Sequence, residues 1–377
     1  METKIIKKSK SFDPIMFLMS LGAGGLSIGL WAFFMFTFKH GKGLFNHDQL
    51  SQVITSNFQK YLFFSTEVLI IIMAIVHLVT ITYLLIKYFK WLKTKDYKNY
   101  ISDPLRNNGI MTVFLTITMT FNVIFAIGNH FIFKNGPLFQ PIMGPALIGY
   151  FILYIFTMGT SIKILKIAFT NTFDFNKIHF GFMMHPFALS MLAVTGFGIS
   201  AFSKNYIISS IAFFLAFAPW LVAILLTLIK IVTMFQHHFK NNLPDRNFLP
   251  STLIVMPTIM LIFLSLTRIG HYLHNNLKGV EIGPAYYAIV TIIPFVFLFW
   301  YGLFSLTLIK DYFKTYKKFN VTQWGFICPI AAFNVIGFAM NKYWLGGVLP
   351  FGYILLTFVF FGIIVYFDLF FKQVKSI

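Results

Sequence analysis

The sequence is poor in acidic residues and holds a single cysteine. Its 377 residues include 11 Asp and Glu against 30 Lys and Arg, and charged residues make up only 11% of the chain. Soluble domains carry about a quarter charged residues, so this scarcity argues against a soluble protein. The lone Cys328 excludes an internal disulfide and any site built on cysteine pairs. The sequence also shows no glycine-rich phosphate loop and no Ser/His/Asp arrangement worth naming. We therefore expect neither an enzyme nor a bound cofactor.

Long apolar segments fill most of the chain instead. Hydrophobic residues make up 58% of the sequence, and the mean hydropathy is +0.76. A helix that crosses a bilayer needs about 20 mostly apolar residues, so the sequence predicts an all-α integral membrane protein, with residues 1–377 forming one transmembrane domain. The predicted spans are 13–38, 62–90, 107–133, 140–169, 178–202, 205–236, 248–274, 281–310, 321–340 and 347–371. Runs such as 69–79 are apolar on every face, unlike the alternating strands of a membrane β-barrel.

The basic residues are distributed unevenly between the two sides of the predicted bundle. Ten spans place 22 of the 30 Lys and Arg on the side of the two termini. The remaining eight are Lys39, Lys42, Lys60, Lys134, Lys204, Arg268, Lys278 and Lys342. Because cytoplasmic loops carry the excess of basic residues, both termini are predicted to lie in the cytoplasm, with the protein in the inner (plasma) membrane. The net charge of +19 is then explained by topology and lipid headgroups, and we expect no binding to nucleic acid.

Prolines and glycines are concentrated in the odd-numbered spans. The fifth, seventh and ninth spans each carry a mid-span proline, namely Pro186, Pro257 and Pro329. The first span carries a glycine cluster that includes Gly22, Gly24 and Gly25. A proline bends a helix and frees a carbonyl that lipid cannot satisfy. This pattern predicts five helical hairpins, with an inner ring of five kinked helices around a pore and an outer ring of five. The alternative is that these residues merely aid helix packing.

The segment that enters the ninth span carries a family resemblance. It reads Lys318-Phe-Asn-Val-Thr-Gln-Trp-Gly-Phe-Ile-Cys-Pro329, and it resembles the ninth helix of the plant guard-cell slow anion channels and their bacterial tellurite-resistance homologues. Pro14, Gly22 and Trp31 resemble the first pore helix of that family, whereas the Pro250 to Pro257 spacing fits less well. The resemblance implies a homotrimer in which each protomer has its own pore, closed midway by a phenylalanine just before the ninth-helix proline.

This chain departs from the family at the position of that phenylalanine. The matching residue is Cys328, and Phe326 lies two residues earlier, about 200° round a helix. Either the pore is wider than in the gated relatives, or another aromatic residue closes it, such as Phe187 beside Pro186. The alternative interpretation of Cys328 is a small packing residue at a kink.

The charges of the spans favour anions over cations. No acidic residue falls in the middle of an odd-numbered span, whereas Arg268 lies near the outer end of the seventh, close to His271 and His274. We therefore predict a path for small anions such as chloride or nitrate, whose weakly polar walls bind them loosely. Arg268 could instead reach the headgroups or pair with Glu67. Glu67 is itself a candidate proton relay, because carboxylates inside membranes are functional candidates.

Two other functions remain open from the sequence. A proton-coupled carrier or exporter for dicarboxylate, sulfite or tellurite would need a titratable group, for which His185 beside the fifth-span proline is the candidate. A haem-binding redox subunit would need two histidines from facing helices. The candidates for that role are His77, His130, His185 and His271. Their predicted depths differ, so we expect no shared haem or metal site.

Overall fold

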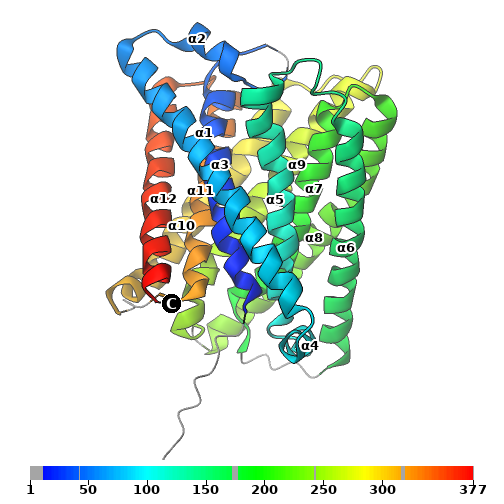
Figure 1. Cartoon of the computed structure of the whole chain (residues 1–377), viewed down its shortest axis with the longest axis vertical. Helices are drawn as coiled ribbons and strands as arrows, with labels where there is room; N and C mark the ends of the chain where they lie inside the picture. Colours follow the sequence, from blue (N-terminus) through cyan, green and yellow to red (C-terminus); the bar gives the residue numbers. More distant parts are fainter. Residues whose placement is uncertain (1–11, 42, 172–176, 242, 316–318, 377) are drawn as a thin grey trace, which may run out of the picture.

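The chain folds as a bundle of long helices (Figure 1). The computed structural model describes residues 12–41, 43–171, 177–241, 243–315 and 319–376. Every regular element in these ranges is a helix, and ten helical segments are long and apolar enough to cross a membrane, which confirms the all-helical prediction. The long helices are α1 (Phe17–Thr37), α3 (Asn57–Trp91), α5 (Met111–Gly128), α6 (Met143–Thr170), α7 (Met184–Phe202), α8 (Tyr206–Asn241), α9 (Val255–Asn276), α10 (Pro284–Thr315), α11 (Ile327–Tyr343) and α12 (Leu349–Lys375).

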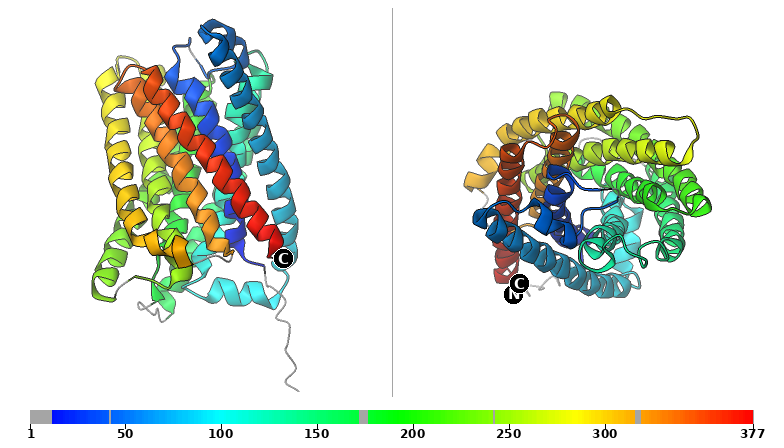
Figure 2. Two further views of the ribbon diagram at one scale, coloured as in Figure 1. Left: turned by 90° about the vertical axis from the view of Figure 1, so that its left-hand side faces the viewer. Right: turned by 90° about the horizontal axis from the view of Figure 1, so that it is seen from above.

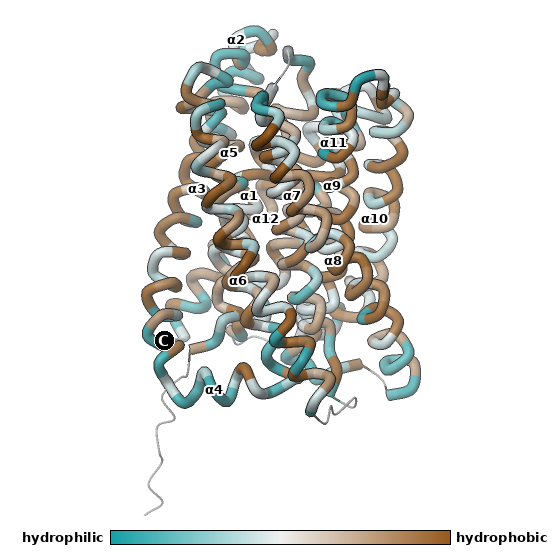
Figure 3. The backbone as a smooth tube through the Cα atoms, turned by 90° about the vertical axis from the view of Figure 1, so that its right-hand side faces the viewer, coloured by the Kyte–Doolittle hydropathy of each residue, from teal (hydrophilic) through white to brown (hydrophobic). Residues whose placement is uncertain are grey.

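The two ends of the bundle are polar and its middle is apolar. Figure 3 shows hydrophobic residues along the long helices and hydrophilic ones at both ends. The short helix α4 (Lys95–Ser102) lies at the end where α1 begins and α12 ends, which we call the terminal end. The short helix α2 (Leu50–Val53) lies at the opposite end, which we call the distal end. Neither short helix was predicted, because both are too short to show a periodic pattern.

Burial alternates along the chain. The most apolar windows of the first, third, fifth, seventh and ninth spans are between 61% and 100% buried, whereas those of the even-numbered spans are between 28% and 39% buried. The buried helices contact one another in sequence: α1 contacts α5 and α11, α7 contacts α5 and α9, and α9 contacts α11. Figure 2 shows this arrangement along the bundle axis. The even-numbered helices therefore supply most of the surface that would face lipid.

Each buried span begins with a 3-10 segment at the terminal end. These segments are η1 (Pro14–Met16), η3 (Asn107–Ile110), η6 (Phe180–Met183), η7 (Arg246–Ile254) and η8 (Val321–Phe326). Pro186, Pro257 and Pro329 each occupy the third position of the α-helix that follows, rather than the middle of an α-helix. The first four N–H groups of a helix have no intrahelical acceptor, so a proline is tolerated there. Prolines also occur inside the exposed helices α8 and α10, so they do not by themselves mark the buried ones.

The glycine cluster of α1 permits close helix packing. A Cβ atom on Gly22 would lie 2.9 Å from Ile327 Cγ2, and one on Gly24 would lie 2.7 Å from Met119 Cγ. A Cβ atom on Gly25 would lie 3.2 Å from Ala331 Cβ. These glycines therefore bring the backbone of α1 close to α5 and α11, as small residues do in membrane helix pairs.

The entry to the fifth span is capped by a histidine. His179 lies directly before η6, and its Nδ1 accepts a hydrogen bond of 3.0 Å from the Gly181 N–H. Its ring stacks on Phe248 of η7, with ring centroids 4.0 Å apart. Burial, and then the nearby His238, lower the pKa of His179 to about 4. The ring therefore caps η6 in its neutral form.

This cap makes folding stability depend on pH. Because the pKa of His179 is lower in the folded protein than its ordinary value of about 6.5, protonation favours the unfolded chain, and stability is lost as pH falls from about 6.5 toward 4. We expect His179→Asn to reduce this loss, since asparagine caps η2 (His47–Gln49) and η8 in the same chain without titrating in this range. The measurement is the thermal unfolding midpoint between pH 7.5 and pH 5. His274→Asn, at an exposed histidine, is the control; equal pH slopes in wild type and His179→Asn would contradict the assignment.

Candidate functional site

The buried helices enclose a cavity of about 110 Å³. All five contribute to its wall, from Gly25 on α1, Met119 on α5, Met191 on α7, Met260 on α9 and Ala331 on α11. Most of the wall is apolar, with methionine side chains from four helices. Methionine is flexible and polarizable, so such a wall can adjust to an occupant. The cavity is the place where the buried helices could form a transport path.

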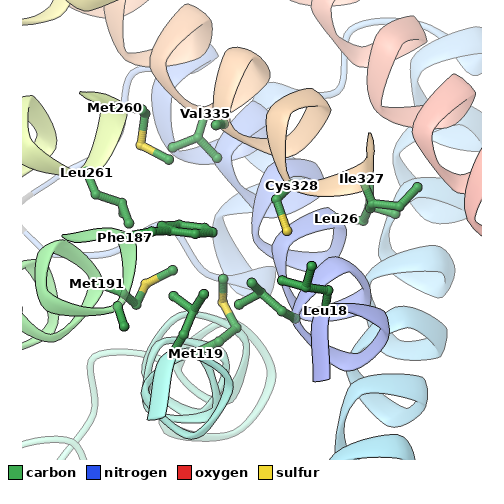
Figure 4. Close-up of a cluster of buried hydrophobic side chains, with 14 of the residues drawn as sticks. Leu18, Leu26, Met119, Phe187, Met191, Met260, Leu261, Ile327, Cys328 and Val335 are labelled. Carbon is green, nitrogen blue, oxygen red and sulfur yellow. The ribbon is translucent and has the colours of Figure 1, made fainter. Parts of the chain in front are cut away.

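Phe187 and Cys328 lie together in the wall toward the terminal end. Figure 4 shows the Phe187 ring pointing from α7 into the centre of the apolar cluster, toward Cys328 on α11. Only 2% of Phe187 is exposed, and Cys328 is also buried. Pro257 borders the same cavity from α9. The early turns of three helices thus bring their side chains together here because each helix starts with a 3-10 segment at the same level.

Phe326, the third candidate for the constriction, lies elsewhere. It is the last residue of η8 and does not border the cavity. Its ring packs edge-on against Tyr312 of α10, with centroids 6.0 Å apart. Gly22, Gly24, Pro186 and Pro329 are also absent from the cavity wall. Of the sequence candidates, the structure brings together Phe187, Cys328, Pro257 and Gly25, with Arg268 further along the cavity.

Arg268 is the only charged side chain that borders the cavity in the described part of the chain. It projects from α9 near the distal end, and its guanidinium carbon lies 5.5 Å from the centre of the Phe202 ring. Its Nε atom is buried without a hydrogen-bond partner, and the described residues supply no ion pair to it. A Cβ atom on Gly198 would lie 3.0 Å from Arg268 Nη1, so this glycine leaves room for the guanidinium.

Two neutral polar side chains also border the cavity. Asn122 on α5 donates a hydrogen bond of 2.8 Å from its Nδ2 to Thr195 Oγ1 on α7. The same amide also donates to the Thr118 carbonyl at 3.3 Å. These groups give an otherwise apolar wall weak polar contacts without adding charge.

Glu67 does not pair with Arg268, which corrects one alternative from the sequence. Its Oε1 lies 2.8 Å from His47 Nδ1 and 2.8 Å from His130 Nε2. His130 Nδ1 lies 3.3 Å from the Phe45 carbonyl oxygen, and Lys134 pairs with Asp48 at 2.6 Å. Glu67 therefore ties the loop after α1 to the end of α5, away from the cavity.

The remaining histidine candidates are dispersed among separate partners. His185 Nε2 lies 2.6 Å from Ser161 Oγ, while its Nδ1 is buried without a partner. His77 lies 3.0 Å from Thr120 Oγ1, and His271 stacks on Tyr287 with centroids 4.9 Å apart. The described residues contain no group of three or more metal-ligating side chains. None of these histidines borders the cavity.

Lys230 forms a partly buried contact that the sequence did not predict. Its Nζ donates to Asn108 Oδ1 at 2.8 Å and to the Phe182 carbonyl at 2.7 Å. Phe182 lies four residues before Pro186, and the proline has no N–H to donate to the Phe182 carbonyl. Lys230 thus joins α8 to the 3-10 entries of the third and fifth spans. The sequence placed it among the cytoplasmic basic residues, and only the freed carbonyl hinted at a buried donor.

Comparison with models of protein families identifies the family of this chain. The sequence model of the SLAC1 family, described as voltage-dependent anion channel, matches residues 11–371. No curated protein matches the chain. A match over nearly the whole chain, together with ten membrane-spanning helices, agrees with the resemblance seen at the entry to the ninth span. The chain therefore belongs to the SLAC1 family, whose members are channels and transporters rather than enzymes, and it is a multi-pass membrane protein that transports anions across the membrane.

Proposed function

We propose that this protein is an anion channel in which the five buried helices form an inner ring around a path for small anions. The observation that carries the proposal is the cavity, which all five buried helices line and which no acidic side chain borders in the described chain. Phe187, beside Cys328, closes the path at the terminal end of the cavity. Pro186, Pro257 and Pro329 help set the helix starts at this level, and the α1 glycines let that helix approach the axis.

A channel accounts for the site better than a proton-coupled carrier does. A carrier needs a titratable group that the substrate path can reach, and its sequence candidate, His185, does not border the cavity. Glu67, the candidate proton relay, is held by His47 and His130 outside the cavity wall. The buried, unpartnered Nδ1 of His185 is the one observation that favours a carrier. Current or flux that requires a proton gradient would favour that second function.

The assembly and the orientation are part of the proposal. The resemblance implies a trimer, and the exposed faces of the even-numbered helices offer the apolar surface that a protomer contact or lipid would cover. The excess of Lys and Arg at the terminal end supports cytoplasmic termini in the plasma membrane.

The test is current through the purified protein in planar bilayers. We expect reversal potentials that follow chloride and nitrate gradients, and we expect Cys328→Phe to lower the current on the order of tenfold, which corresponds to about 1.4 kcal/mol on the barrier. The reason is that a second ring would face Phe187 across the path. Cys328→Ser, which keeps the small volume, is the matched control and should conduct like wild type. Absence of anion-selective current in correctly assembled wild type would contradict the proposed function.

A further inference from the structure

We infer that Arg268 forms a binding site for one monovalent anion in the distal part of the cavity. The inference rests on the proposed function and deepens it, because it assigns a residue and a charge class to the path. It starts from a guanidinium that borders the cavity and has no protein counter-charge among the described residues.

An unpaired guanidinium at this depth needs a partner. Burying a charge is costly unless it is paired and hydrogen-bonded, and arginine stays protonated and presents five N–H donors in a fixed fork. Arg268 Nε is buried without an acceptor. The ring of Phe202 lies near the guanidinium carbon and Gly198 lies beside Nη1. Neither supplies a negative charge, so an anion from solution is the partner that would satisfy the site.

The charged groups around Arg268 also favour an anion at this site. Glu67, the carboxylate that the sequence offered as a partner for Arg268, contacts His47 and His130 instead. At the same end of the bundle, Lys342 Nζ lies 3.4 Å from the Met35 carbonyl oxygen and 3.4 Å from His40 Nε2. Among the described residues Lys342 forms no ion pair, so it adds positive charge at the distal end, which raises the local concentration of anions.

The single positive charge sets the class of anion. A monovalent anion at Arg268 would be neutralised by the guanidinium, with Asn122 and Thr195 as the neutral polar groups of the same cavity. A dianion such as sulfate or a dicarboxylate would keep one charge uncompensated among apolar side chains, and such a charge is costly. The site therefore selects halide-sized or nitrate-sized monovalent anions over dianions.

The experiment measures how anions stabilise the purified protein against thermal unfolding. Sodium bromide is titrated against sodium gluconate at constant ionic strength, with sodium sulfate as the dianion probe. Because a ligand that binds only the folded state raises its stability, we expect bromide to raise the wild-type unfolding midpoint by about 2–4 °C. The part of the sulfate response that Arg268→Gln removes should be clearly smaller, because sulfate also stabilises proteins through its exclusion from their surface. Arg268→Gln should lose the bromide response, whereas Lys204→Gln, at an exposed lysine near the same end, should keep it.

A second variant keeps the charge of Arg268 but changes the position of its guanidinium. Gly198→Ala adds a methyl group 3.0 Å from Nη1 and so displaces the guanidinium without removing it. We expect this variant to need several-fold more bromide for half of the stabilisation. If Arg268→Gln does not fold, Gly198→Ala still tests whether Arg268 binds bromide.

Several results would overturn the inference. A bromide response in Arg268→Gln equal to that of wild type would remove Arg268 from the site, and an unchanged response in Gly198→Ala would do the same. A sulfate response that depends on Arg268 and is as large as that of bromide would overturn the charge class. These failures are distinct from failure of the proposed function, because wild-type anion current in bilayers tests that function without reference to Arg268.

Discussion

Replacing Phe187 by alanine is expected to raise anion current on the order of tenfold or more, because a tenfold change needs only about 1.4 kcal/mol off the barrier. The ring points from α7 into the centre of the apolar cluster, beside Cys328 (Figure 4). Removing it opens the path toward the terminal end, where the opposing residue is already small. Single-channel conductance and anion flux into liposomes measure the effect.

The control for this prediction is Phe197→Ala on the same helix. Phe197 is fully buried but packs against Phe213 and Phe217 rather than the cavity. Both substitutions remove a buried ring and are expected to cost about 3–5 kcal/mol of stability. Only Phe187→Ala should increase current. If both variants conduct like wild type at equal amounts of assembled protein, Phe187 does not close the path.

The ten spans follow from a one-dimensional signal, the length of the apolar runs. These lengths predicted ten spans, because lipid requires continuous apolar helices. The structure confirms ten such helices, although their ends differ from the predicted ones. The seventh span shows why the ends shift. Its predicted start at 248 falls inside the 3-10 segment η7, and the α-helix begins only at Val255. Hydropathy does not distinguish a 3-10 turn from an α-helical one.

The candidate site could be predicted only in part. The family motif named Cys328 and the position beside Pro186 named Phe187, and both residues border the cavity. Side-chain pairing was not predictable, because it joins residues far apart in sequence. Glu67 meets His130, 63 residues away, rather than Arg268. His47, in the loop after α1, also contacts Glu67. A hydropathy pattern gives no indication of such a contact.

Replacing Lys230 by methionine is expected to lower the free energy of unfolding by roughly 2–4 kcal/mol, since each buried acceptor left without a donor costs about 1–3 kcal/mol. The two acceptors are Asn108 Oδ1 and the Phe182 carbonyl. Removing a partly buried charge offsets part of this cost. We expect the loss of the two hydrogen bonds to dominate, because Pro186 has no N–H to donate to the Phe182 carbonyl.

The sign of the change in unfolding midpoint therefore decides what Lys230 does. A lower midpoint in Lys230→Met, with no change in Lys240→Met at the exposed end of the same helix, would show that the ammonium stabilises the 3-10 entries. An unchanged or higher midpoint would show that its burial is a net cost. A double-mutant cycle with Asn108→Ala separates the two contacts. If the Phe182 carbonyl carries most of the effect, Lys230→Met remains strongly destabilising in the Asn108→Ala background. In that case Lys230 of α8 stabilises the turn that precedes Phe187.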